Sequence, residues 1–161
     1  MTRPVIVTGC GRSGTHWLGN IMERVFGHEA AAFEPPAPNT IGTVIVDSRL
    51  RHKVKNMDAA GHKIVHLVRD GRDVVRSLDK WHWLTGPSGP IDFVKCCKEW
   101  SDAIDMMRGY EIVRIEDLST PESKDASDSH RFPHWTEWYE GLMDIFWANC
   151  GEQMTRMGYE R

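Results

Sequence analysis

Short segments rich in β-branched residues alternate along this chain with longer segments whose apolar residues recur at helical spacing. The β-branched segments predict strands at residues 4–9, 43–46, 63–68 and 111–115, and a second short segment, at 30–34 before two prolines, predicts another. The longer segments predict helices, at residues 17–26, 74–81, 93–107 and 135–146. Because strands that alternate with helices pair in parallel, the pattern predicts a three-layer α/β fold, with a central parallel sheet flanked by helices.

The composition is that of an ordinary globular chain. The 161 residues predict a single domain spanning 1–161, with 40% hydrophobic and 27% charged residues. The net charge of −3 provides no overall attraction to nucleic acid or to an anionic membrane, so we expect neither as a partner. Any anion-binding site must therefore be local.

The cysteines and the apolar runs indicate in which cellular compartment the protein is expected. No C-x-x-C pair is present, which predicts reduced thiols in a cytoplasmic protein. The cysteines concerned are Cys10, Cys96, Cys97 and Cys150. The start, MTRPVIVTG, has too short an apolar run for a signal peptide, and no run approaches the length of a membrane span. Residues 119–134 are polar, contain two prolines and predict a mobile loop.

The segment TGCGRSGTHW, which follows the first predicted strand, has the features of a phosphate-binding loop. Gly9 and Gly14 are spaced as in G-x-x-x-x-G-K-[ST], but Thr15 stands where the lysine is expected. Backbone N–H groups in such a loop form an anion nest, and the next helix adds positive charge at its N-terminus. Arg12 supplies a cation, and the hydroxyl of Ser13 supplies a donor. Taken alone, the segment is equally typical of a glycine turn without a ligand.

A second cationic segment, RDGRDVVRS, runs from Arg69 to Ser77 after the fourth predicted strand. Arg69 can contact a phosphate with two N–H groups, and Ser77, about two helical turns on, can donate to the same group. The alternative is a helix start with Asp70 and Asp73 near its positive end and arginines in solvent. In parallel sheets ligands bind beyond the carboxyl ends of the strands, where both segments are expected.

Together the two segments resemble the sulfotransferase family, which uses 3′-phosphoadenosine 5′-phosphosulfate (PAPS). Arg12–Leu18, RSGTHWL, is similar to its motif [KR]-S-G-T-T-W-L, and Arg69–Ser77 is similar to R-[DN]-x-[RK]-D-V-x-x-S. Val113–Leu118, VRIEDL, resembles V-R-Y-E-D-L, with isoleucine for tyrosine. Gly158 and Tyr159 look like the usual tail. The carbohydrate and tyrosyl branches are more similar than the cytosolic small-molecule branch.

The resemblance implies a P-loop-like fold and a nucleotide site. The first motif would wrap the 5′-phosphosulfate of PAPS, and the second would bind its 3′-phosphate. The implied cofactor-binding residues are Gly11, Arg12, Ser13, Gly14, Thr15, His16, Trp17, Arg69 and Ser77. Arg12 would act near the bond to the leaving sulfuryl group. Trp17 would stack on adenine or pack in the core, and His16 would contribute its backbone N–H. The product would be 3′-phosphoadenosine 5′-phosphate (PAP), and no metal is required.

The expected reaction is in-line transfer of a sulfuryl group to an acceptor hydroxyl or amine, with a base that takes the acceptor's proton. Related carbohydrate and tyrosyl enzymes use a glutamate shortly after the first helix, which favours Glu34 in AAFEPP. Asp47 is the next candidate, followed by His52 and His16. A sugar, a lipid headgroup, a peptide tyrosine and a small metabolite all remain possible acceptors, and Glu34 favours a glycan. The sequence predicts no oligomeric state.

Two other functions fit parts of the sequence. TVIVD, residues 43–47, resembles a Walker B strand that holds Mg²⁺ in a nucleotide kinase or NTPase, but the missing lysine argues against one. A non-catalytic module that binds PAP or PAPS is the other alternative. His62 and His66 have H-x-x-x-H spacing, but on a strand they would lie about 13 Å apart, too far to share a metal.

Overall fold

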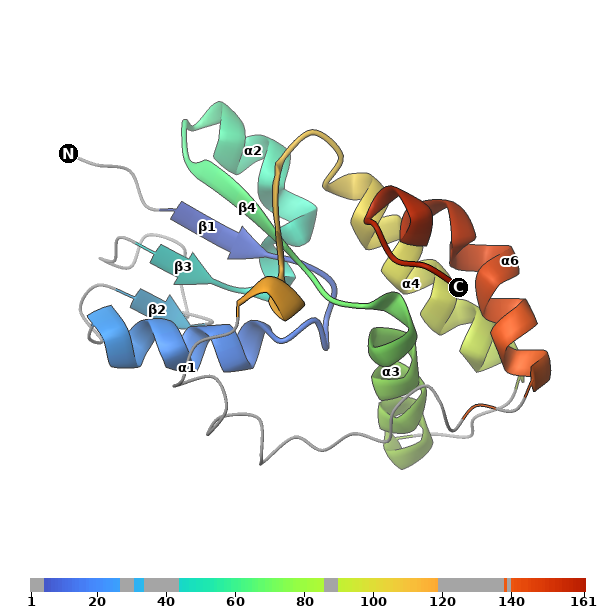
Figure 1. Cartoon of the computed structure of the whole chain (residues 1–161). Coiled ribbons are helices and arrows are strands. Elements are labelled where there is room, and N and C mark those ends of the chain that lie inside the picture. The colour runs from blue at the N-terminus through green and yellow to red at the C-terminus, as the bar shows by residue number, and fades with distance from the viewer. Residues whose placement is uncertain (1–4, 27–30, 34–43, 86–89, 119–137, 139) are drawn as a thin grey trace.

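The computed structural model describes residues 5–26, 31–33, 44–85, 90–118, 138 and 140–161. Within these residues one sheet has the strand order β2-β3-β1-β4-β5, and every neighbouring pair is parallel (Figure 1). Its strands are β1 (Val5–Thr8), β2 (Ala31–Phe33), β3 (Val44–Val46), β4 (Lys63–Val68) and β5 (Glu111–Arg114). The predicted α/β class with a central parallel sheet is thus confirmed.

Helices follow the strands as the periodicity predicts. In the described parts of the chain, the α-helices are α1 (Thr15–Phe26), α2 (Val54–Ala59), α3 (Gly71–Thr85), α4 (Pro90–Met106) and α6 (Glu140–Arg156). The same parts contain the 3₁₀ turns η1 (Ser48–Lys53) and η2 (Ile115–Asp117). The sequence pattern did not predict η1 and α2, and α6 extends well beyond the predicted end at Phe146. The predicted loop at 119–134 lies outside the described residues.

Alternating side chains of the sheet pack against helices on both faces. Val7, Val46 and Leu67 form a buried cluster with Leu18 and Met22 of α1 on one face. The other face carries a second cluster, with members Ile6, Ile45, Leu50, Val54, Met57, Ile64 and Met107. Because side chains alternate along a strand, β1, β3 and β4 each contribute to both clusters. Helices therefore cover both faces of the sheet (Figure 1).

A third cluster lies between α3, α4 and α6, beside the sheet. Trp100 and Phe146 are fully buried there, with ring centroids 6.4 Å apart. The chain's four cysteines are buried free thiols, as predicted. Burial raises the pKa of Cys10 and of Cys96 to about 12, so these thiols stay protonated at neutral pH. Within the described ranges, no helix is both long and apolar enough to cross a membrane.

The chain leaves β1 and β4 in opposite directions across the sheet. From β1 it passes through α1 to β2 on one side, and from β4 it passes through α3 and α4 to β5 on the other. Since β1 and β4 are neighbours, their carboxyl ends form a switch point of the kind at which open α/β sheets bind ligands. Both predicted anion-binding segments start there.

His66 on β4 is a buried histidine with one unpartnered ring nitrogen among the described residues. It lies beside Thr8 of β1, and both side chains are almost fully buried. Among the described residues, neither His66 Nε2 nor Thr8 Oγ1 has a hydrogen-bond partner. Desolvation lowers the pKa of His66 to about 4, so the imidazole is neutral in the folded protein at neutral pH.

This burial predicts a loss of stability in mild acid. Between the unfolded pKa near 6.5 and the folded pKa of about 4, the unfolded chain binds a proton that the folded chain does not. The free energy of unfolding should therefore fall by about 3 kcal/mol from this residue as the pH decreases across that window. Urea unfolding of parent and His66→Leu across this range would measure the difference. His52→Gln changes an exposed histidine and should leave the slope of unfolding free energy against pH as it is in the parent. A slope in His66→Leu as steep as the parent's would contradict the role given to His66.

Candidate anion-binding site

The loop between β1 and α1 has a backbone suited to holding an anion. Arg12 has φ 68° and Gly14 has φ 87°, both in the left-handed region. A non-glycine residue in that region is uncommon, and strained backbone positions of this kind cluster at ligand-binding and active sites. The Ser13 N–H donates to the Cys10 carbonyl at 3.2 Å, and the Leu18 N–H donates to the Gly14 carbonyl at 2.9 Å. The N–H groups of the first turn of α1 precede that bond and have no acceptor within the helix.

Close approaches on two sides fix the loop in place. A Cβ atom at Gly9 would lie 2.3 Å from the Leu67 carbonyl oxygen of β4. A Cβ atom at Gly14 would lie 2.1 Å from Ile115 Cδ1 of η2. The two glycines of the motif are therefore required by packing as well as by any ligand. At Gly11, by contrast, a Cβ atom would have no neighbour within 4 Å.

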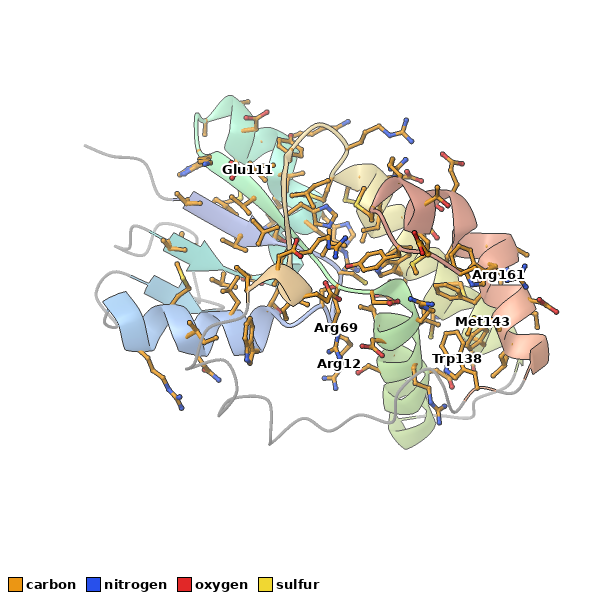
Figure 2. All side chains as sticks on the ribbon, viewed as in Figure 1. Arg12, Arg69, Glu111, Trp138, Met143 and Arg161 are labelled. Atoms are coloured by element: carbon orange, nitrogen blue, oxygen red, sulfur yellow. The ribbon has the colours of Figure 1, made fainter. Side chains whose placement is uncertain are left out.

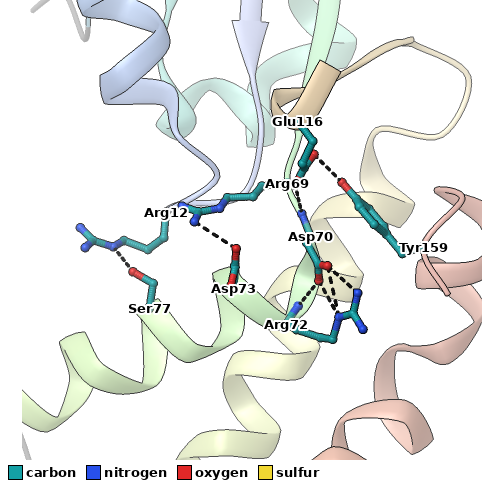
Figure 3. A network of polar contacts seen from close by, with 8 residues as sticks. All are labelled: Arg12, Arg69, Asp70, Arg72, Asp73, Ser77, Glu116 and Tyr159. Carbon is teal, nitrogen blue, oxygen red and sulfur yellow. Dashed lines mark hydrogen bonds and ion pairs between the residues drawn. The ribbon is translucent and has the colours of Figure 1, made fainter. Parts of the chain in front are cut away.

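A hydrogen bond joins this loop to the second cationic segment. Arg12 Nε donates to Ser77 Oγ at 2.9 Å, although the two residues are 65 apart in the sequence (Figure 3). Ser77 lies on α3 and is buried. The bond places the two predicted motifs on one site at the switch point.

Arg12 and Arg69 bring two positive charges to this place. Figure 2 shows both side chains below the carboxyl ends of the strands. Partial burial, and then the charge of Arg69, lower the pKa of Arg12. An anion bound between the two guanidinium groups would relieve this repulsion and form charge-assisted hydrogen bonds.

Acidic residues at the start of α3 orient its arginines. Arg69 Nη2 donates to Asp73 Oδ2 at 3.1 Å, and both side chains are about three-quarters buried. Asp70 accepts the backbone N–H of Arg72 at 2.9 Å and pairs with the Arg72 guanidinium at 2.7 Å. The interpretation that placed Asp70 near the positive end of the helix is confirmed. The same interpretation placed the arginines in solvent. This is wrong for Arg72, whose side chain is almost fully buried.

The structure brings most of the predicted nucleotide-binding residues together. Ser13 and Thr15 are buried, at the end of the loop and at the first position of α1. Trp17 is half-buried on the same helix. His16 belongs to α1 by its backbone, but its side chain is outside the described part of the chain.

The candidates for the base are distributed differently. Asp47 is buried at the carboxyl end of β3, and its N–H donates to the Val7 carbonyl at 3.0 Å, which places it next to β1. His52 is exposed on η1. Glu34 lies outside the described residues, so its position relative to the loop stays a prediction.

Two contacts of the site were not predicted from the sequence. The first is the ion pair between Arg69 and Asp73, whose spacing of four residues on a helix was the available signal. The second is Glu116 of η2, which accepts the Asp70 N–H at 2.8 Å. The similarity of VRIEDL to a family motif marked this segment, but the spacing of its residues does not reveal the partner.

The arrangement can bind a phosphate- or sulfate-type anion. It combines backbone N–H donors, two guanidinium groups and the Ser77 hydroxyl at one edge of the sheet. Within the described residues, no group of three His, Cys, Asp or Glu side chains could hold a metal ion. No family model matches the chain, and no curated protein matches its sequence.

The contact between Gly14 and Ile115 can be tested by substitution. Gly14→Ala should destabilise the protein by about 1–3 kcal/mol, because the new methyl group meets Ile115 and the positive φ strains alanine. The double variant Gly14→Ala/Ile115→Ala should lose less stability than the sum of the two single variants, because the clash between the new methyl group and the Ile115 side chain is removed. Urea unfolding measures all three. Gly11→Ala is the matched control, expected within about 0.5 kcal/mol of the parent. Strict additivity would contradict the contact.

Proposed function

We propose that this protein is a PAPS-dependent sulfotransferase, which moves a sulfuryl group to an acceptor hydroxyl or amine. The observation that carries the proposal is the hydrogen bond from Arg12 to Ser77. The two motifs that resemble the family were recognised separately, and this bond is a contact between them. A single site with two cationic groups suits a nucleotide that carries an anionic group at each end.

The two ends of PAPS are assigned to different elements. The P-loop-like turn from Gly9 to Thr15 and the start of α1 would hold the 5′-phosphosulfate, through backbone N–H groups and the helix dipole. Arg69 and Ser77 would hold the 3′-phosphate. A hydroxyl has one donor and two acceptor positions, so Ser77 can accept from Arg12 and still donate to a phosphate.

This chain's own residues would carry the charge and the proton during transfer. PAPS supplies an activated sulfuryl group, and the acceptor oxygen or nitrogen forms the new bond to sulfur as the bond to the 5′-phosphate oxygen breaks. Arg12 would stabilise negative charge on that oxygen. Glu34 is the first candidate for the base, and Asp47, His52 and His16 are alternatives. A glycan or a small molecule is the proposed acceptor.

A nucleotide kinase or NTPase is the second candidate, favoured by one observation. Asp47 is buried next to the end of β1, where a carboxylate could reach a magnesium ion on a bound nucleotide. The loop lacks the lysine of that class. Binding of PAP without metal supports the sulfotransferase, whereas magnesium-dependent binding of ATP would support the kinase. PAP binding without transfer to any acceptor in a broad panel would identify a non-catalytic module.

Arg69→Ala should weaken PAP binding by about tenfold or more, because the 3′-phosphate loses a charge-assisted contact. The variant also leaves Asp73 without its cation, which adds repulsion. Isothermal titration calorimetry with PAP measures the effect. Arg108→Ala is the control, since that side chain is 65% exposed in the turn after α4. Equal affinity in Arg69→Ala and the parent would remove Arg69 from the site.

Glu34→Gln should leave PAP binding unchanged and lower turnover by about 100-fold or more, because it removes the base but no contact to the nucleotide. The assay follows sulfuryl transfer from labelled PAPS to a panel of glycans and small alcohols. Asp47→Asn, measured in parallel, distinguishes the two carboxylates. Full turnover in Glu34→Gln would transfer the role to Asp47, His52 or His16.

A further inference from the structure

The Glu116 carboxylate bridges two segments that are far apart in the sequence. One oxygen, Oε1, accepts the backbone N–H of Asp70 at 2.8 Å. The other, Oε2, accepts the hydroxyl of Tyr159 at 2.9 Å (Figure 3). The start of α3 is thereby linked through one side chain to the segment that follows α6.

The end of α6 directs Tyr159 back to this point. Gly158 has φ 79°, and its N–H donates to the Thr155 carbonyl at 3.0 Å. The Tyr159 N–H donates to the Met154 carbonyl at 2.9 Å. This pair of bonds is the Schellman arrangement, which ends a helix and reverses the chain. Tyr159 then packs under Arg114 of β5, whose guanidinium carbon is 5.0 Å from the ring centroid.

Tyr159 is held as a hydrogen-bond donor. Its side chain is buried, and desolvation together with the Glu116 charge raises the pKa of the phenol above its usual value. The hydroxyl is therefore protonated at neutral pH and donates to the carboxylate.

The bridge acts on the peptide that carries Arg69. Asp70 caps α3, and the Asp70 N–H that Glu116 accepts belongs to the peptide bond between Arg69 and Asp70. The same 3₁₀ turn, η2, also contacts the first loop, because Ile115 packs where a Gly14 side chain would be. One short turn thus touches both cationic segments of the site.

We propose that Tyr159 and Glu116 are positioning residues, which hold Arg69 for the 3′-phosphate of the nucleotide. The inference rests on the proposed function, and it makes affinity for the 3′-phosphate depend on a tyrosine about 90 residues away in sequence. Neither side chain needs to touch the nucleotide. Their effect is on the direction of the Arg69 backbone, and through it on the guanidinium.

The test compares PAP with adenosine 5′-phosphate, which lacks the 3′-phosphate. Tyr159→Phe should weaken PAP binding by about fivefold and leave the affinity for adenosine 5′-phosphate within about twofold, because only the Arg69 end is disturbed. Glu116→Ala should weaken PAP binding more than Tyr159→Phe does, again without a change in affinity for adenosine 5′-phosphate. Glu116→Gln should recover much of it, since the amide retains an oxygen for the Asp70 N–H. Calorimetric titration gives all the dissociation constants.

Tyr110→Phe is the matched control. Tyr110 also donates to a carboxylate, Asp58 Oδ2 at 3.4 Å, but it precedes β5 and lies at the amino ends of the strands. Loss of the hydroxyl at this position should leave the affinities for PAP and for adenosine 5′-phosphate unchanged. A ligand-free measurement completes the design: hydrogen exchange of the Asp70 amide should be faster in Tyr159→Phe and Glu116→Ala than in the parent and in Tyr110→Phe.

The outcomes separate this inference from the proposed function. If the parent binds PAP and Tyr159→Phe binds both nucleotides as the parent does, the positioning role is overturned and the proposed function stands. Equal losses for both nucleotides indicate general structural damage and also overturn the role. If the parent does not bind PAP, the proposed function fails. The role of Tyr159 and Glu116 in nucleotide binding then fails as well, even if the Asp70 amide exchanges faster in their variants.

Discussion

The approach of two arginine side chains to each other at the carboxyl end of a parallel sheet is the constraint on which the candidate site depends. Arg12 comes from the turn after β1, and Arg69 comes from the end of β4. Neighbouring strands bring them together, Ser77 and Asp73 hold their side chains, and partial burial keeps water from screening their charges fully. Asp73 already pairs with Arg69, and an anion bound there would add charge-assisted hydrogen bonds to both guanidinium groups, which is the physical reason to expect a ligand.

Much of the fold could be predicted because it depends on local patterns. The β-branched runs specified β1, β3, β4 and β5, a short segment of alanines and phenylalanine specified β2, and apolar periodicity specified α1, α3 and α4. The η1–α2 segment was missed because its buried residues, Leu50, Val54 and Met57, are few and lie among exposed polar ones. The later part of α6 was missed although its buried Cys150 and Met154 continue the spacing of four from Phe146, because Gly151 and polar residues lie between them.

The site was predictable only in part, for a different physical reason. Motif spacing indicated Arg12, Arg69 and Ser77, but it carries no information on which side chains meet across the fold. The contacts of Glu116 with Asp70 and Tyr159 join residues more than 40 positions apart, so only the three-dimensional arrangement reveals them. Glu34 remains a prediction from the resemblance, because it lies outside the described residues.

The strand order also has a consequence for how the chain folds as it is synthesised. The first strand made, β1, is central, and its two neighbours, β3 and β4, follow only after α1 and β2. Until Val68 has left the ribosome, β1 lacks a partner along one edge, and its apolar side chains remain partly uncovered. Parallel pairing over such separations is slow compared with helix formation. The nascent chain should therefore pass through a stage in which an incomplete sheet is open to association with other chains.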